Sequence, residues 1–348
     1  MVNIPKEHKA AVCEGAGKGL VVKMVPTPKP ESNQVLIKVL ASSLCFSDEF
    51  AVDHGAMGVK FPLTPGHEVV GRIVQKGSGV SDEFKEGLLV GLGWNGGYCQ
   101  QCEACRKGEF YGCNNGLVTG FHTEGGHQEY LTARWEAVVK LPENSGLSPA
   151  EMAPLLCAGI TVNDGLNATG AKPGDVVIVQ GLGGLGHLGI QFARKAGYHV
   201  VAMSGGDSKK DLALKLGAHD FFNAKQGEEF KKKYGGAKAA VATAPSSAAI
   251  SSLLPLLARN GVMTVVGIPP DGKNLEFAPM QLVSNRCTVK GITCGCSINN
   301  EELVDFAVLG DNKVRSMVNI KKLDDADAVY KDTAQGNPRF RNVFVFDE

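Results

Sequence analysis

The stretch VVIVQGLGGLG at residues 176–186 decides the fold of the central part of the chain. An apolar run leads into Gly181, Gly183 and Gly186, which fit the pattern G-x-G-x-x-G, and a helical pattern follows. In such a strand–turn–helix unit the glycines allow a tight turn, close approach of the backbone to a pyrophosphate, and packing of helix on strand. The unpaired N–H groups of the helix N-terminus favour phosphate binding. The stretch therefore predicts a dinucleotide site, with an unliganded glycine turn as the alternative.

Apolar runs and helical patterns alternate on both sides of this turn. We expect strands at 176–180, 199–203, 239–243 and 262–266, and helices at 149–167, 186–196, 209–216 and 248–258. This alternation is typical of a doubly wound parallel sheet. After residue 280 it fades into a strand at 289–293, a helix at 301–309 and a last strand at 342–346. The tail is too short for a domain of its own, so we expect it to pack on the N-terminal part.

The first 150 residues or so follow a different pattern. Short β-runs at 35–40, 69–74 and 88–93 are separated by Gly and Pro, which predicts a small β-barrel or sandwich-like domain. At about 100–200 residues per domain, the chain length of 348 also suggests two domains. The sequence as a whole therefore indicates a β-rich domain together with a doubly wound α/β domain.

Composition narrows the class of protein further. The 36 basic side chains are balanced by 36 acidic ones, so we expect no nucleic-acid partner. No apolar window approaches the ~18 residues of a membrane span, and the first residues lack the apolar segment of a signal peptide. We therefore expect a cytoplasmic protein without a membrane partner. In that compartment its 10 cysteines are expected to be metal ligands or core residues rather than disulfides.

Four cysteines stand close together in the segment GGYCQQCEACRKGEFYGC at residues 96–113. They are Cys99, Cys102, Cys105 and Cys113, and four thiolates at these spacings can close a tetrahedral shell around Zn²⁺ without an open position. A disulfide pair and an iron–sulfur cluster are the alternatives. The first conflicts with a reducing compartment and the second with the lack of a partner redox motif. The segment predicts a structural zinc site that stabilises a loop with little core.

The end of the second strand bears on the choice of cofactor. An NAD enzyme usually has Asp or Glu there to bind the ribose hydroxyls, whereas this sequence has Ser204, followed by Lys209 and Lys210. A hydroxyl can donate to a 2′-phosphate and the lysines can neutralise it, so these residues favour NADP(H) over NAD(H). Against this, Asp207 lies close by, and the lysines alternatively form the solvated start of a helix.

Three further strings are CFSD at 45–48, GHE at 66–68 and CAGIT at 157–161. Taken alone, their cysteines are more often small buried packing residues, and the alternative for His67 is a turn residue. Together, and in order with the cysteine segment and the glycine turn, they resemble the zinc-dependent alcohol dehydrogenases of the medium-chain dehydrogenase/reductase superfamily. The length and the CAGIT string look most like the yeast-type tetrameric members. The resemblance implies a GroES-like catalytic domain over 1–152 and 287–348, a Rossmann domain over 153–286, and a homo-oligomer, a tetramer rather than a dimer.

The resemblance also implies roles for single residues. A catalytic zinc with one open position is implied to be held by Cys45, His67, Cys157 and, during ligand exchange, Glu68. Asp48 is implied to orient the imidazole of His67. Ser47 is implied to hydrogen-bond the substrate oxygen and to begin a proton relay. Together with the cysteine segment, this gives two zinc ions per chain.

The resemblance adds cofactor and substrate residues to those of the glycine turn. The predicted cofactor contacts from the turn and the second strand are Gly181, Gly183, Gly184, Leu185, Gly186, Ser204 and Lys209. The resemblance further implies Thr161 near the nicotinamide and Arg341 at the pyrophosphate. Trp94 and Phe121 fall where aromatic residues line the substrate pocket, with a plain core role as the alternative. The implied reaction is hydride transfer between NAD(P)(H) and a primary or secondary alcohol or its carbonyl, with zinc as the Lewis acid.

Two positions depart from the family pattern. Phe46 stands where many relatives have His, and Phe50 stands where the proton relay normally ends in His. The final proton carrier is therefore open between Glu49, His54 and solvent, with a surface role as the alternative for His54. The two phenylalanines also suggest a substrate larger or more hydrophobic than ethanol.

Two other classes remain as alternatives. A zinc-independent reductase of the same superfamily acts on C=C bonds, but it lacks the three catalytic ligands that this sequence carries. A non-catalytic protein that binds zinc and a nucleotide is the second, and the absence of His at Phe50 keeps it open. The leading hypothesis differs from both in requiring turnover of a small-molecule alcohol or aldehyde at a catalytic zinc.

Overall fold

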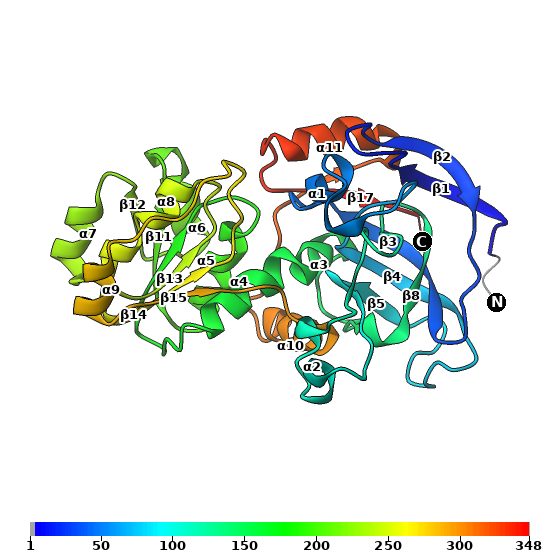
Figure 1. The fold of residues 1–348 in the computed structure, drawn as a ribbon, viewed down its shortest axis with the longest axis horizontal. Helices are drawn as coiled ribbons and strands as arrows, with labels where there is room; N and C mark the ends of the chain where they lie inside the picture. The colour runs from blue at the N-terminus through cyan, green and yellow to red at the C-terminus, as the bar shows by residue number, and fades with distance from the viewer. Residues whose placement is uncertain (1–3, 348) are drawn as a thin grey trace. The chain divides into compact units, whose positions relative to one another are not determined.

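The computed structural model describes residues 4–347, which divide into two compact units. Unit 1 contains the chain as far as Cys157, the segment Gly295–Leu309 and the chain from Ser316 onward, and unit 2 contains Ala158–Cys294 and Gly310–Arg315. In Figure 1, unit 1 contains the blue and cyan beginning of the chain, the orange helix within Gly295–Leu309 and the red end, and most of unit 2 is the green and yellow middle. Unit 2 is therefore an insertion within unit 1.

The limits of the units fall later than the predicted 152 and 286. Strand β15 (Thr288–Gly291) pairs in parallel with β14 (Leu257–Val265), so the sheet of unit 2 extends past residue 286. At the first limit, the 3₁₀ turn Ala153–Leu156 packs on strands β3 (Gln34–Ser43) and β4 (Val69–Lys76) of unit 1.

Unit 2 is built on a six-stranded sheet in the order β12-β11-β10-β13-β14-β15, and all its neighbouring strands are parallel. Its remaining strands are β10 (Val176–Gln180), β11 (His199–Ser204), β12 (Asp220–Asn223) and β13 (Ala237–Ala242). In chain order the arrangement is 3-2-1-4-5-6, which confirms the predicted doubly wound fold. The strand order reverses between β10 and β13, and the glycine turn directly follows β10.

Helices and turns connect these strands. They are α4 (Ala158–Asn167), α5 (Gly186–Lys195), α6 (Lys210–Lys215), α7 (Gly227–Tyr234), α8 (Ser247–Ser251) and α9 (Pro279–Asn285). The sequence reading missed β12 and α7, because the strand is only four residues long. The helix predicted at 248–258 is too long: a 3₁₀ turn containing Pro255 follows α8, and Leu257 already begins β14.

The prediction of a single helix over 149–167 is wrong. The segment forms α3 (Pro149–Met152), then the 3₁₀ turn Ala153–Leu156, then α4. Pro154 has no N–H to donate within a helix, and Cys157 adopts non-helical angles of φ −132° and ψ −67°. The break leaves Cys157 at the junction of the two helical segments.

Unit 1 is built on a mixed sheet in the order β16-β17-β3-β4-β5-β9, with β8 paired to β3. Its other strands are β5 (Leu89–Leu92), β8 (Tyr130–Arg134), β9 (Val139–Lys140), β16 (Val318–Lys321) and β17 (Arg341–Val345). Two small sheets accompany it: β1 (Glu7–Val12) with β2 (Val21–Pro26), and β6 (Asn95–Gly97) with β7 (Leu117–Val118). Its α-helices besides α3 are α1 (Asp48–Val52), α2 (Glu103–Arg106), α10 (Ser297–Val308) and α11 (Ala326–Ala334).

Strand β3 is the centre of this sheet. Its side chains alternate between two apolar clusters, with Val35 and Ile37 on one side and Leu36 on the other, as expected for a strand buried on both faces. The last strand of the chain, β17, pairs antiparallel with β3. Among the residues that the structure describes, no helix has both the length and the apolar character that a membrane crossing requires.

Candidate metal centres and cofactor turn

The buried cluster, which we define as Cys45, His67, Glu68 and Cys157, lies in unit 1. One donor atom from each of these residues lies within 4.8 Å of all the others. Ser42 of β3 is paired with Val69 of β4, so the end of one strand and the start of the other are adjacent. The sheet thus brings Cys45 beside His67 and Glu68, and the break before α4 adds Cys157.

The chemistry of the buried cluster fits a zinc ion. Nε2 of His67 and Oε1 of Glu68 are buried without a hydrogen-bond partner in the described structure, whereas buried polar atoms are normally paired. A hydrogen bond from Cys157 lowers the pKa of the Cys45 thiol, which favours the thiolate that a metal requires. Two sulfurs, one imidazole nitrogen and a carboxylate oxygen match the donor set of a zinc site with an exchangeable position.

Asp48 supports His67 from behind. Its Oδ1 lies 3.0 Å from Nδ1 of His67, and its Oδ2 accepts a hydrogen bond of 2.9 Å from the backbone N–H of Cys45. Asp48 is fully buried, which opposes ionisation, yet the neighbouring imidazoles of His67 and His127 hold the pKa of its carboxyl below the usual value. The carboxylate is therefore charged and turned toward the nitrogen of His67 that faces away from the cluster.

Glu68 is held by a buried arginine. The guanidinium of Arg341 donates to Oε2 of Glu68 and lies 3.4 Å from the hydroxyl of Ser43. Burial raises the pKa of the Glu68 carboxyl to about 8, although the charge of Arg341 opposes this shift. The structure thus places Arg341 beside the buried cluster, and its predicted contact with a pyrophosphate stays a prediction.

Aromatic rings cover one side of His67. The ring of Trp94 lies edge-on to the imidazole with centroids 4.9 Å apart, and Phe121 lies 5.0 Å from Trp94. Phe50, which replaces the expected relay histidine, packs against the apolar cluster that contains Phe121. These contacts make an apolar wall beside the buried cluster.

Ser47, Glu49 and His54 are the residues considered for the proton relay. Ser47 lies directly before α1, next to Asp48, and its side chain makes no capping hydrogen bond to that helix. His54 is more than half exposed, and its Nε2 lies 3.7 Å from Oε1 of Glu49. Glu49, His54 and solvent therefore stay the three candidates for the final proton carrier.

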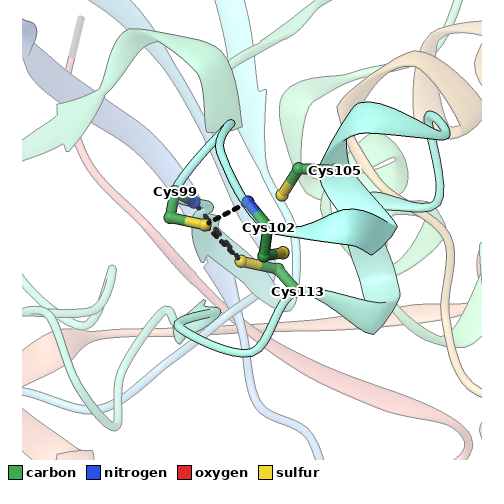
Figure 2. A group of neighbouring side chains, drawn as sticks. All are labelled: Cys99, Cys102, Cys105 and Cys113. Carbon is green, nitrogen blue, oxygen red and sulfur yellow. Dashed lines mark hydrogen bonds between the residues drawn. The ribbon is translucent and has the colours of Figure 1, made fainter.

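The cysteine lobe, which we define as Cys99, Cys102, Cys105 and Cys113, is the second group of converging donors. Figure 2 shows the four side chains turned toward one another between a loop and α2. The backbone N–H groups of Cys99 and Cys102 donate to the sulfurs of Cys113 and Cys99 at 3.3 and 3.4 Å. N–H groups of Gln101 and Cys102 lower the pKa of Cys99 to about 6. Four sulfurs at this spacing fit a closed tetrahedral zinc site.

The glycine turn of unit 2 has the shape that a dinucleotide needs. Gly181 has a φ of +88°, and a Cβ there would meet the Thr243 hydroxyl at 2.6 Å. A Cβ on Gly186 would lie 1.7 Å from the carbonyl oxygen of Gly181, whereas one on Gly183 would meet nothing within 4 Å. The first and last glycines are therefore required by packing, and the middle one leaves an open backbone face. Gly184 and Leu185 complete the turn before α5.

The other predicted cofactor residues of unit 2 lie on separate elements. Ser204 ends β11 and Thr161 lies on α4. The side chain of Lys209 returns to the glycine turn, where its Nζ donates to the carbonyl oxygen of Leu182 at 2.9 Å. Asp207 accepts a hydrogen bond from Asn223. The ammonium group of Lys209 thus contacts the glycine turn, and the preference for NADP(H) stays a prediction.

His127 is a residue that the sequence reading missed. It is buried, its Nδ1 lies 2.8 Å from the hydroxyl of Ser42, and its Nε2 lies 3.6 Å from Oδ2 of Asp48. A single histidine in a glycine-rich segment gives no signal of this position, because only the pairing of β3 with its neighbours brings it behind Asp48.

Comparison with known proteins places the chain in a family. Residues 31–143 match the family described as "Alcohol dehydrogenase GroES-like domain", and residues 184–308 match "Zinc-binding dehydrogenase". The alcohol dehydrogenase notN of Aspergillus sp. is 36% identical over 99% of this chain and 100% of its own. An alcohol dehydrogenase of Geobacillus stearothermophilus is 38% identical over 97% of this chain and 100% of its own.

Solved structures agree with these relatives. A cinnamyl alcohol dehydrogenase from Sorghum bicolor superposes with a TM-score of 0.88 at 29% identity, covering 98% of both chains. The CAD from Helicobacter pylori, solved with NADP(H), gives a TM-score of 0.86 at 26% identity over 97% of this chain and 98% of that one. The chain therefore belongs to the zinc-dependent alcohol dehydrogenases of the medium-chain dehydrogenase/reductase superfamily and is an NAD(P)-linked oxidoreductase. The predicted family, fold class and enzyme class are confirmed.

Proposed function

We propose that this enzyme interconverts bulky apolar aldehydes and their alcohols, with aromatic aldehydes as preferred substrates, NADP(H) as preferred cofactor and two zinc ions per chain. The observation that carries the proposal is the buried cluster with the rings of Trp94 and Phe121 against His67. An apolar wall beside a Lewis-acid site stabilises an apolar substituent on the reacting carbon. The likeness to a cinnamyl alcohol dehydrogenase supports the same substrate class.

The residues of unit 1 have distinct roles in this reaction. When bound, zinc supplies the Lewis acid for the substrate oxygen, and the nicotinamide supplies or accepts the hydride. Cys45, His67 and Cys157 hold the metal, and Glu68 is the carboxylate that can exchange with water or substrate. Asp48 fixes the orientation of His67 through the 3.0 Å contact at Nδ1. The hydroxyl of Ser47 passes the proton to or from the substrate oxygen.

The cofactor preference rests on the neutral Ser204 and on Lys209. Ser204 ends β11, where a carboxylate would repel a 2′-phosphate, and Lys209 brings a cation to the turn that receives the pyrophosphate. The proposed contacts at the turn are with Gly181, Gly183, Gly184, Leu185 and Gly186. Thr161 beside the nicotinamide and Arg341 at the pyrophosphate complete the proposed set.

The second zinc ion is proposed for the cysteine lobe, where four sulfurs leave no open position. Its role is structural, because the lobe is a loop with only one buried cysteine, Cys105. The same sulfurs without a metal are the alternative, and metal analysis separates the two.

The enzyme is further proposed to form homo-oligomers. Strand β15 ends the sheet of unit 2, and large apolar side chains in the chain segment between β14 and β15 are more than two-thirds exposed: Ile268, Met280 and Val283. An unpaired edge strand beside exposed apolar groups favours association with a second copy. The tetramer and the cytoplasmic location stay predictions from the sequence, tested by light scattering of the purified protein and by fractionation of cells.

A kinetic panel tests the substrate and the cofactor together. We expect kcat/KM to be at least about tenfold higher for cinnamaldehyde and benzaldehyde than for acetaldehyde, and about tenfold higher with NADPH than with NADH. Lys209→Ala should lower kcat/KM for NADPH about tenfold and leave the NADH value unchanged, the scale of one charge-assisted hydrogen bond. Lys215→Ala, on the exposed side of α6, is the matched control. Equal rates for acetaldehyde reject the substrate class, and a preference for NADH rejects the cofactor assignment.

A further inference from the structure

His127 follows two glycines in the segment Glu124–Glu129 and packs against the turn that carries His67. The backbone N–H groups of Gly125, Gly126 and His127 donate to the carbonyl oxygens of Thr64, Gly66 and Pro65 at 2.7, 2.8 and 3.1 Å. Three consecutive hydrogen bonds thus tie this segment to the residues directly before His67.

Glycines make this close approach possible. Gly66 has a φ of +105°, and a Cβ on it would lie 2.5 Å from Nδ1 of His127. A Cβ on Gly126 would lie 2.2 Å from a methyl carbon of Val69 and 2.9 Å from the hydroxyl of Ser42. Any side chain at Gly66 or Gly126 would displace the imidazole of His127 or the strand beneath it.

The ring of His127 is held on three sides. Its Nδ1 lies 2.8 Å from the Ser42 hydroxyl, and its ring forms a T-shaped pair with Phe344, with centroids 5.2 Å apart. Its Nε2 has no hydrogen-bond partner among the described residues and points at Oδ2 of Asp48 from 3.6 Å. That distance exceeds a hydrogen bond, so the contact is electrostatic. The imidazole of His127 is therefore oriented with Nδ1 toward Ser42 and Nε2 toward Asp48.

Asp48 is therefore held on both of its oxygens. Oδ1 faces Nδ1 of His67 at 3.0 Å, while Oδ2 receives the N–H of Cys45 and faces His127. Fixing both oxygens fixes the plane of the carboxylate, and that plane sets the direction of the His67 ring. The unpartnered Nε2 of His67 then points into the buried cluster.

We propose that His127 is a positioning residue for zinc binding: it holds Asp48 from the side opposite His67 and so fixes the imidazole that ligates the catalytic metal. The inference rests on the proposed zinc at the buried cluster and extends it by a residue that touches neither metal nor substrate. Supporting residues of this kind commonly change metal affinity 10–100-fold.

The test uses His127→Phe, which keeps a ring against Phe344 and removes both ring nitrogens. The rate of zinc loss from the intact enzyme to excess chelator is measured, together with the visible spectrum after cobalt replacement and kcat and KM with each substrate. We expect about tenfold faster loss of one zinc, a shifted cobalt spectrum and a kcat about tenfold lower at unchanged cofactor KM. His127→Gln, which keeps a donor group, should fall between this variant and the wild type.

The matched control is His8→Phe. His8 is also a buried histidine of the N-terminal half, and it contacts Thr27 and Gln128 instead of Asp48. Its variant should release zinc within about twofold of the wild-type rate even where its melting temperature falls. Wild-type zinc release and cobalt spectrum in His127→Phe overturn the proposal and leave the histidine a packing role.

Folding failure does not prevent a decision. If His127→Phe does not fold, Ser42→Ala and His127→Gln receive the same measurements, and wild-type values in both overturn the proposal. A wild-type enzyme whose only zinc survives Cys45→Ala rejects the catalytic centre itself, and this inference with it. A two-zinc wild type with unaltered His127 variants rejects only the positioning role.

Discussion

The cysteine lobe and the buried cluster use the same donor atom in opposite settings. The lobe draws its four sulfurs from residues 99–113, and backbone N–H groups of the same loop donate to them. The buried cluster draws Cys45, His67 and Cys157 from three distant segments that the central sheet of unit 1 brings together. Three of the four lobe cysteines are partly exposed, whereas both cysteines of the buried cluster are buried.

Because of this difference, we expect the cysteine lobe to matter for the stability of the protein and the buried cluster to matter for its activity. We expect a loop with little core to depend on its proposed metal to stay folded, since binding free energy there is folding free energy. A cluster at the junction of β3 and β4 takes its geometry from a packed sheet, so its donor atoms stay in place on that scaffold. Loss of a ligand should therefore unfold the one region and inactivate the other.

The largest expected effect is that of Cys45→Ala. Removing one ligand of the buried cluster should lower kcat/KM at least about 1,000-fold, because a lost Lewis acid costs several kcal/mol of transition-state stabilisation. Metal analysis should find one zinc fewer, and the melting temperature should change by only a few degrees. Cys13→Ala, at a buried cysteine outside both centres, should keep kcat/KM within about twofold. A Cys45→Ala enzyme with two zinc ions or substantial turnover would contradict the assignment.

Cys102→Ala should act on stability instead. We expect the free energy of unfolding in urea to fall by about 3 kcal/mol. This is the effect typical of removing a cross-link that closes a loop of this kind. The folded fraction should keep kcat within about twofold and lose one zinc. Cys287→Ala, at a half-buried cysteine of unit 2, is the control and should keep both metals. An unchanged urea midpoint in Cys102→Ala would remove the structural role of the lobe.

Asp48→Asn tests the support that the buried cluster receives from outside its ligands. The amide keeps the size of the carboxylate but loses the charge that faces His67 at 3.0 Å. We expect zinc affinity at this centre and kcat/KM to fall about 10–100-fold, while the lobe zinc is unaffected. Asp53→Asn, whose carboxylate accepts from Tyr330 instead, should leave both zinc ions in place. Equal zinc loss from both variants would show that the effect is not specific to His67.

The smallest expected effect is the difference in stability cost between two Gly→Ala substitutions, both at glycines with a positive φ. Gly108, in the lobe, has a φ of +80° and no atom within 4 Å of an added Cβ, so Gly108→Ala should cost about 1 kcal/mol of stability. Gly66 has a φ of +105° and an added Cβ would clash with His127, so Gly66→Ala should cost about 2 kcal/mol more and lower activity as well. Urea unfolding and kcat/KM measure both. Equal costs would mean that the turn before His67 tolerates displacement of His127.

Prediction from the sequence worked where the relevant atoms are close in the chain. The glycine turn after β10 and the four lobe cysteines are such cases, because each is complete within about 20 residues. It failed at the helix expected over 149–167, where Pro154 and the packing of the preceding turn on β3 and β4 break the helix at Cys157. Prediction from the sequence also missed His127. Alternation patterns indicate that a side chain is buried, but they do not indicate that it contacts Asp48.

The sequence by itself determined the doubly wound sheet around the glycine turn and the grouping of the four lobe cysteines. Local spacing and hydrophobic periodicity are sufficient for these two features, because they depend on neighbouring residues. The family and the ligands proposed for the buried cluster followed from the resemblance of several separate motifs to known enzymes. Only the tertiary structure decided that Arg341 contacts Glu68 and that Phe50 packs against the apolar cluster that contains Phe121. It also decided that Asp48 is held between two histidines. These contacts join residues from separate strands and loops, and strand pairing and close packing alone determine which of them meet.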